Sequence, residues 1–133
     1  KELQVFHFIG EFRRKGHLLS ITNPIRPRLD RQPNLNFEYF GFTKEDLKQS
    51  FIAGKTLELE NPTLENIIAY LQKIYCGSIG IEYHYMVKAE DRHWVQHEFE
   101  KRSTNHSFPV EKKKHILRML NKTVMFEKFL HTK

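Results

Sequence analysis

Apolar residues near the start of the chain recur at helical spacing. Most lie three residues apart, with others beside them: Leu3, Val5, Phe6, Phe8, Ile9 and Phe12. This spacing is typical of a helix buried along a broad face, and we expect the helix to continue through Leu18 and Leu19 to about Thr22. Asn23-Pro24 should end it, because proline disfavours helix at its own position and at the residue before it.

The next stretch is rich in proline and then regains helical signals. Prolines at 24, 27 and 33 are separated mainly by arginines and flanked by asparagines, which indicates an extended connector. Thr43 and Asp46 have the spacing of a capping box, in which a side-chain oxygen and an acid three residues later satisfy free backbone amides. We therefore predict a short helix that runs to about Phe51 and is stopped by Gly54.

The clearest helical pattern follows Pro62. Its apolar residues line one face: Leu64, Ile67, Ile68, Leu71, Ile74 and Tyr75. Cys76-Gly77 should close this helix with Gly77 in the left-handed conformation, which would make Gly77 the pivot of the domain. Residues 79–85 then alternate between apolar and other residues, which predicts one short extended segment with its isoleucines and tyrosines buried on one face.

The last third of the chain is predicted to be helical. One helix should cover residues 90–102, and a second should open at Ser107-Phe108-Pro109 and end near Leu120. Residues 121–123 are predicted as a break before a final short helix. The predicted fold class is mainly α: an irregular multi-helix domain with a proline-rich connector and one short extended segment.

The composition is that of one folded domain. Apolar residues make up 39% of the 133 and aromatic residues 13%, which is more core material than a disordered chain carries. A membrane-spanning helix needs about 20 consecutive apolar residues, and no uncharged stretch here approaches that length. The first ten residues lack the pattern of a secretory signal, and the single Cys76 favours a reducing compartment. Lys1 in place of a starting Met indicates a piece of a longer chain.

Charge raises the possibility of an acidic partner. The chain carries 22 Lys and Arg against 16 Asp and Glu, a net charge of +6. The basic residues gather in three separate clusters, at 13–15, 26–31 and 112–118, without the aromatic signature, GXXG loop or zinc finger of common nucleic-acid-binding modules. A free-standing basic helical module that binds nucleic acid or an acidic protein therefore stays as the alternative function, with nucleic acid the less favoured partner.

Residue patterns that could carry chemistry are weak. His93 and His97 lie four apart on a predicted helix, with Glu90 and Glu100 on the same flank, a spacing that can hold a divalent metal. The full His-Glu-x-x-His pattern is missing, so we expect both histidines to face solvent without metal. Cys76 is expected to be a packed small apolar residue rather than a nucleophile. The Gly77–Gly80 loop follows a helix instead of a strand, so a turn is favoured over a phosphate-binding loop.

The order of several short motifs supplies a stronger signal. The nine residues from Tyr75 to Tyr83 are followed by Arg92–Gln96 and Phe99-Glu100. Other blocks lie upstream and downstream at matching spacing: Phe8-Ile9, Arg13–His17, Asn23-Pro24, Phe40–Phe42, Asp46-Leu47 and Phe126–Leu130. Together they resemble the N-terminal helical region of 2-oxoglutarate dehydrogenase, in its thiamine-dependent decarboxylating first component.

The resemblance implies a role for the chain as part of a larger enzyme. The parent would decarboxylate 2-oxoglutarate on thiamine diphosphate with magnesium and pass the succinyl group to a lipoyl acyltransferase in the citric acid cycle. It would be a homodimer in the bacterial cytoplasm, or in the mitochondrial matrix of a eukaryote. The family's cofactor motifs lie beyond residue 133. Residues 1–133 would therefore form a single helical scaffold domain, packed on the catalytic domain, with no catalytic, cofactor-binding or metal residues. A close relative acting on 2-oxoadipate stays as a third interpretation, because the residues that choose the substrate lie outside this segment.

Overall fold

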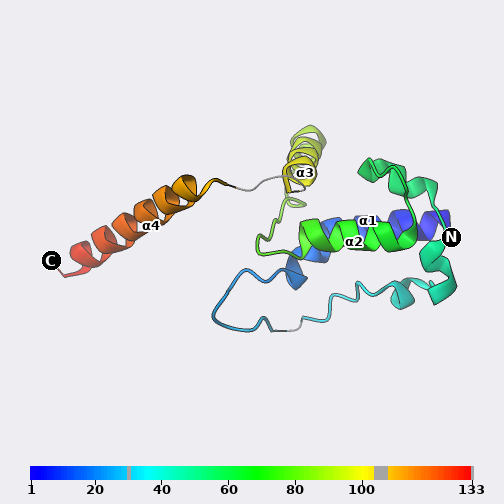
Figure 1. The fold of residues 1–133 in the computed structure, drawn as a ribbon, viewed down its shortest axis with the longest axis horizontal. Coiled ribbons are helices and arrows are strands. Elements are labelled where there is room, and N and C mark those ends of the chain that lie inside the picture. Colours follow the sequence, from blue (N-terminus) through cyan, green and yellow to red (C-terminus); the bar gives the residue numbers. More distant parts are fainter. Residues whose placement is uncertain (30, 104–107, 133) are drawn as a thin grey trace.

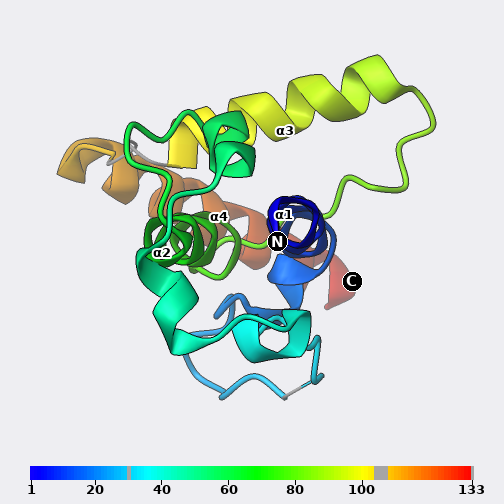
Figure 2. The ribbon, with the colours of Figure 1, turned by 90° about the vertical axis from the view of Figure 1, so that its right-hand side faces the viewer.

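Two parallel helices form the centre of the molecule, and a third helix crosses over them (Figures 1 and 2). The structure is a computed structural model that describes residues 1–29, 31–103 and 108–132. Within these ranges it is helical, with no strand and one isolated bridge between Ser50 and Thr63. The predicted mainly α fold class is therefore confirmed. None of the described helices has the length and apolar character that crossing a membrane requires.

Helix α1 (Glu2–Lys15) buries a narrower stripe than its sequence predicts. Its buried apolar residues follow the i, i+3, i+4, i+7 pattern: Val5, Phe8, Ile9 and Phe12. Leu3 and Phe6 lie on the other side of the helix and are 86% and 60% exposed, so their predicted burial is wrong. The helix also ends at Lys15 and continues only as the 3-10 turn η1 (Gly16–Leu19), short of Thr22.

The segment between α1 and α2 contains short turns rather than long helices. The proline-rich connector is confirmed as non-helical, and η2 (Phe37–Phe40) follows it. The capping box between Thr43 and Asp46 is confirmed at the start of η3 (Lys44–Lys48), where the Thr43 amide donates to Asp46 Oδ2 at 2.9 Å. Gly54 does not stop a helix; it lies inside η4 (Ile52–Leu57).

Helix α2 (Leu64–Tyr75) lies beside α1 and ends where predicted, at Cys76. Gly77 is not left-handed, however, because Gly41 is the one glycine with a positive φ in the described part of the chain. Residues 79–85 form no strand and bury no regular face: Tyr83 is buried, whereas Ile79 and Tyr85 are exposed. The periodic pattern is not realised because no second strand lies alongside to pair with this segment.

Two helices complete the chain. The predicted helix at 90–102 is confirmed as α3 (Ala89–Ser103). Helix α4 (Val110–His131) runs without the predicted break at 121–123, because that stretch contains no proline or glycine and the Thr123 hydroxyl donates back to the Met119 carbonyl at 3.1 Å. The predicted opening at Ser107 lies outside the described residues. Figure 1 shows α4 extending away from the other helices, so that the two ends of the chain lie far apart.

Close contacts explain two of the glycines. A Cβ at Gly16 would lie 2.5 Å from Tyr75 Cβ, at the point where the ends of α1 and α2 meet. A Cβ at Gly54 would lie 2.6 Å from both Ile67 Cδ1 and Pro62 Cβ. At Gly77 the nearest atom would be the Lys73 carbonyl oxygen at 3.4 Å, which is an ordinary contact. Tight packing therefore requires glycine at 16 and 54 but not at 77.

We expect Gly54→Val to destabilise the domain more than Gly77→Val, which reverses the expectation from sequence. Adding a side chain against the buried Ile67 and the rigid Pro62 overpacks the core, which typically costs about 1–3 kcal/mol. Urea unfolding of the two variants would measure the difference in free energy of unfolding. Equal midpoints, or a lower midpoint for Gly77→Val, would contradict the prediction.

Candidate functional site

A buried group of polar side chains joins α1, α2, α3 and the segment before α3. At its centre is Glu100, which is only 8% exposed. Arg13 donates from Nε to Glu100 Oε1 at 2.8 Å and from Nη2 to Oε2 at 3.1 Å. The Tyr75 hydroxyl donates to the same Oε1 at 2.6 Å and lies 3.2 Å from the Tyr83 hydroxyl. One carboxylate thus receives hydrogen bonds from two helices. We call these four residues the Glu100 cluster.

The electrostatics of the Glu100 cluster favour a fixed arrangement. Burial alone would lower the pKa of Arg13, but its hydrogen bonds and attraction to Glu100 raise the pKa overall, so the guanidinium is charged. Burial, followed by the nearby Glu100 charge, raises the pKa of Tyr75, and burial likewise raises that of Tyr83. Both phenols therefore stay protonated. The hydrogen bonds of the Glu100 cluster thus join its four side chains to one another inside the domain.

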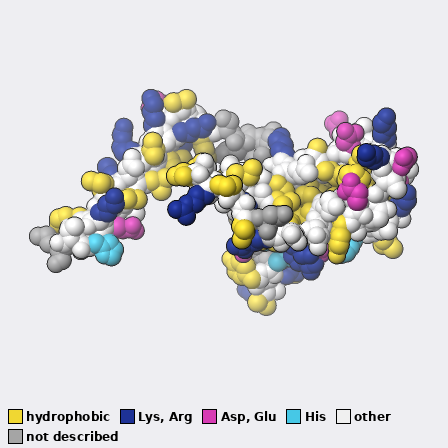
Figure 3. Space-filling model, turned by 90° about the horizontal axis from the view of Figure 1, so that it is seen from below, with side chains coloured by type: hydrophobic (Ala, Val, Ile, Leu, Met, Phe, Trp, Pro, Cys, Tyr) yellow, Lys and Arg dark blue, Asp and Glu magenta, His cyan; other side chains and the backbone are white. Residues whose placement is uncertain are grey.

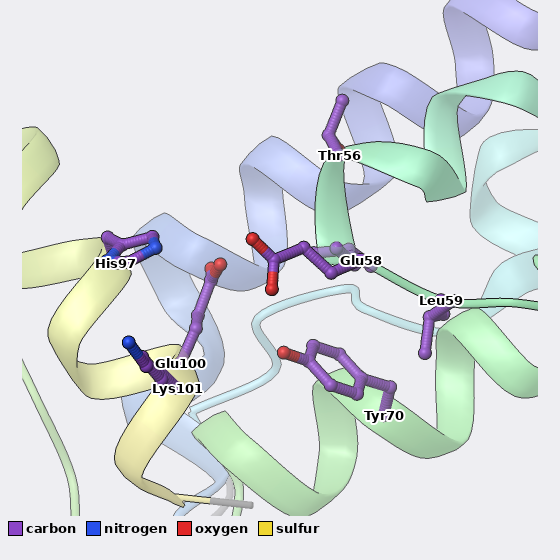
Figure 4. Close-up of a pocket in the computed structure, with 8 residues that line it drawn as sticks. Thr56, Glu58, Leu59, Tyr70, His97, Glu100 and Lys101 are labelled. Carbon is purple, nitrogen blue, oxygen red and sulfur yellow. The ribbon is translucent and has the colours of Figure 1, made fainter.

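A cleft of about 330 Å³ opens beside the Glu100 cluster, between η4, α2 and α3. Figure 4 shows Glu58 reaching from η4 toward Glu100, with the Tyr70 hydroxyl directed toward the same space. Burial is the main cause of a raised pKa at Tyr70, and the charges of Glu100 and Glu58 add to it. The remaining lining residues come from η4, the segment directly after it and α3: Thr56, Leu57, Leu59, His97 and Lys101. Glu100 lines both this cleft and the buried cluster, and the sequence did not predict the cleft because η4 was not predicted.

The two histidines at metal-ligand spacing are not brought together with acidic residues into a ligand set. His93 and His97 are both exposed, as expected, and Glu90 is exposed as well. The Glu100 carboxylate turns inward to Arg13 and Tyr75. No group of three or more His, Cys, Asp or Glu that could hold a metal occurs among the residues that the structure describes.

Cys76 and the loop after it have structural surroundings. Cys76 is half-buried against the core, and burial raises the pKa of its thiol to about 11. At neutral pH it is therefore a thiol rather than the thiolate that nucleophilic chemistry needs. The Gly77–Gly80 loop leaves the carboxyl end of α2, where free carbonyls rather than free amides gather. A Cβ at Gly80 would lie 2.8 Å from Ser20 Oγ, so this loop packs closely on the segment after α1.

Two of the three basic clusters contain residues that bind within the domain. In the first, Arg13 belongs to the Glu100 cluster, and Arg14 and Lys15 pair with the buried Glu11. In the second, Arg28 Nη1 donates to the Ser20 carbonyl at 2.6 Å. The third cluster, residues 112–118, lies on the exposed helix α4. Sequence alone could not separate basic residues that hold the fold from those that face a partner.

Comparison with known proteins extends along the whole chain. It is 34% identical over 141 aligned residues to the multifunctional 2-oxoglutarate metabolism enzyme of Mycolicibacterium vanbaalenii, covering 100% of this chain and 11% of that protein. It is 32% identical over 125 residues to the 2-oxoglutarate dehydrogenase E1 component of Coxiella burnetii, covering 94% of this chain and 13% of the relative. The E1 component of Cupriavidus necator is also 32% identical, over 136 residues, with 100% and 14% covered.

These relatives confirm the resemblance inferred from the short motifs. No protein-family model matches the chain. The chain spans between 11% and 14% of the length of these three curated relatives, so it corresponds to a small part of each.

We expect Glu100→Gln to destabilise the domain strongly. The change keeps the side-chain shape but leaves Arg13 charged, buried and without its partner, and breaking a buried ion pair in this way typically costs about 3–5 kcal/mol. Glu98→Gln on the same helix is the matched control. Its pair with Arg102 is largely exposed, so its loss should cost under about 1 kcal/mol. Urea unfolding would compare the two variants, and equal losses of stability would show that the Glu100 cluster is not structural.

The raised pKa of Cys76 predicts a loss of stability at alkaline pH. Its pKa of about 11 in the folded chain exceeds the ordinary thiol pKa of 9.0, so the thiol of the unfolded chain ionises first. The contribution of the thiol to stability is therefore complete below pH 9 and is lost as the pH rises through about 11. Between pH 9 and 11 the unmodified chain should therefore lose free energy of unfolding relative to Cys76→Ala, which has no thiol to ionise. A difference that stays constant from pH 8 to 11 would contradict the assignment.

Proposed function

We propose that this chain is the N-terminal helical scaffold segment of a 2-oxoglutarate dehydrogenase E1 component. The supporting observation is that the residues carrying the resemblance build the Glu100 cluster. Arg13 comes from the Arg13–His17 block, Tyr75 and Tyr83 are the two ends of the Tyr75–Tyr83 block, and Glu100 ends the Phe99-Glu100 block. The motifs are far apart in sequence and meet in one buried structure. Their role is therefore to hold three helices together.

The proposed division of labour assigns the chemistry to the remainder of the parent. The described residues do not fit thiamine diphosphate or magnesium: they present no group of metal ligands, and the donors of the Glu100 cluster are directed at one another. Thiamine diphosphate with magnesium, bound elsewhere, would supply the decarboxylation of 2-oxoglutarate. The product would leave as a succinyl group on a lipoyl acyltransferase.

The wider setting follows from the same assignment. The parent would be a homodimeric oxidoreductase of a multienzyme complex, in the cytoplasm if the source is bacterial, or in the mitochondrial matrix if the source is eukaryotic. Residues 1–133 would form one of its domains, docked on its own catalytic domain. A parent that acts on 2-oxoadipate would use the same scaffold. The alternative, a free-standing basic module for an acidic partner, draws its support from the exposed basic cluster on α4.

Activity of the parent chain tests this proposal. The full-length protein, supplied with thiamine diphosphate, magnesium and ferricyanide as oxidant, should release carbon dioxide from 2-oxoglutarate, and a parallel assay with 2-oxoadipate should define the preferred substrate. The 133-residue chain alone should release none and should show no cofactor binding by calorimetry at micromolar affinity, about −8 kcal/mol. A parent inactive on both substrates, or saturable cofactor binding by the 133-residue chain, would overturn the proposal.

A further inference from the structure

Helix α4 exposes an unusual amount of apolar surface. Ten large apolar side chains on it are between 37% and 67% exposed: Val110, Ile116, Leu117, Met119, Leu120, Val124, Met125, Phe126, Phe129 and Leu130. On the face of α4 visible in Figure 3, hydrophobic side chains are interspersed with Lys and Arg. Among the described residues, α4 packs against no other helix. These side chains are therefore not buried against another described helix.

The apolar residues are distributed unevenly along α4. Its first half carries most of the positive charge, in the 112–118 cluster. The apolar residues of this half do not cover the whole helix, so one side of it is basic. In the second half, Val124, Met125 and Phe126 are consecutive, and successive residues of a helix point about 100° apart. Phe129 and Leu130 extend the apolar surface by another turn. The apolar side chains of residues 119–130 therefore point in most directions around the helix. Polar residues lie among them: Asn121, Lys122, Thr123, Glu127 and Lys128.

This distribution decides between the possible occupants. A helix that lies on one surface needs a single apolar face, whereas apolar side chains on several sides of a helix leave water only when several sides are covered. A membrane span does not fit, because α4 lacks the required apolar length and carries charged residues throughout. Pairing with α4 of a second copy would cover one face and leave the others in water. The occupant must contact several faces of the helix.

We propose that residues 119–130 of α4 are enclosed by the part of the parent chain outside this segment. The inference rests on the proposed function in that it requires a longer parent. The relatives provide one, since the aligned segment accounts for only 11–14% of their length. The enclosing surface should be an apolar channel for residues 119–130, with acidic residues where the channel opens toward the 112–118 cluster. Helix α4 would then join the helical domain that contains the Glu100 cluster to the catalytic domain of the parent.

Hydrogen exchange gives a direct test. Most of the stability of a helix in a protein comes from tertiary packing rather than from helix propensity, so amides of residues 119–130 should exchange rapidly in the 133-residue chain. In the full-length parent the same amides should exchange on the order of 100-fold more slowly, because enclosure prevents local opening. Equal exchange rates in the two proteins would overturn the proposal. Protection in the 133-residue chain that increases with protein concentration would also overturn it, by showing a second copy as the occupant.

A matched pair of variants locates the enclosed half. Leu120→Gln and Lys113→Gln replace exposed residues of α4 by glutamine, and all three residue types have similar helix propensity. In the parent, Leu120→Gln should speed exchange of residues 119–130 at least about tenfold, whereas Lys113→Gln should leave it unchanged. The reverse pattern, or no effect of Leu120→Gln, would contradict enclosure. Unchanged urea midpoints of both variants in the 133-residue chain would establish that the helical body still folds.

The outcome is separable from the enzymatic assignment. Protection of α4 in a parent that is inactive on 2-oxoglutarate would leave the enclosure intact and refute only the proposed substrate. An active parent in which the amides of α4 are unprotected would support the proposed function and refute the enclosure of α4.

Discussion

The ion pair between Arg13 and Glu100 determines how the rest of the molecule is arranged. Both side chains are almost entirely out of water, and the residues are 87 positions apart. A carboxylate in such a place is tolerated only if its oxygens accept good hydrogen bonds, and here two bonds from Arg13 and one from Tyr75 do so. These bonds fix α3 against the ends of α1 and α2. Moving any one helix would leave a buried charge without a partner.

The neighbouring contacts are tight because of this requirement. Arg13 can reach Glu100 only when the end of α1 lies close to Tyr75, and the absence of a side chain at Gly16 permits that approach. Tyr83 completes the cluster from the segment after α2, which explains why one tyrosine of that segment is buried while Tyr85 is not. Packing of apolar residues supplies the driving force for this domain. The polar cluster specifies which of several possible packings is adopted.

Sequence patterns predicted the parts of this fold that depend on local physics. The boundaries of α2 and α3 and the capping box at Thr43 follow from periodicity and side-chain hydrogen bonding to the nearby backbone. The wrong predictions concern features that depend on contacts between residues far apart in the sequence. A periodic pattern in α1 did not reveal which side faces α2, and no local signal distinguishes Gly54, buried under Ile67, from Gly77 in open surroundings. The Glu100 cluster was likewise invisible, although each of its residues lies in a motif that supported the resemblance.

The motifs that carry the resemblance also supply the Glu100 cluster, and this suggests a structural role for them. Ordered short motifs shared with an enzyme are often assumed to surround its active site, yet here their polar groups are consumed by one another inside a helical body. Their spacing would then be maintained because three helices must meet, and the chemistry would be free to lie elsewhere. A helical body closed in this way can contribute to an enzyme only through its surface. Helix α4 exposes many large apolar side chains. If the domain influences the reaction, we expect it to do so through the way α4 is packed in the parent chain.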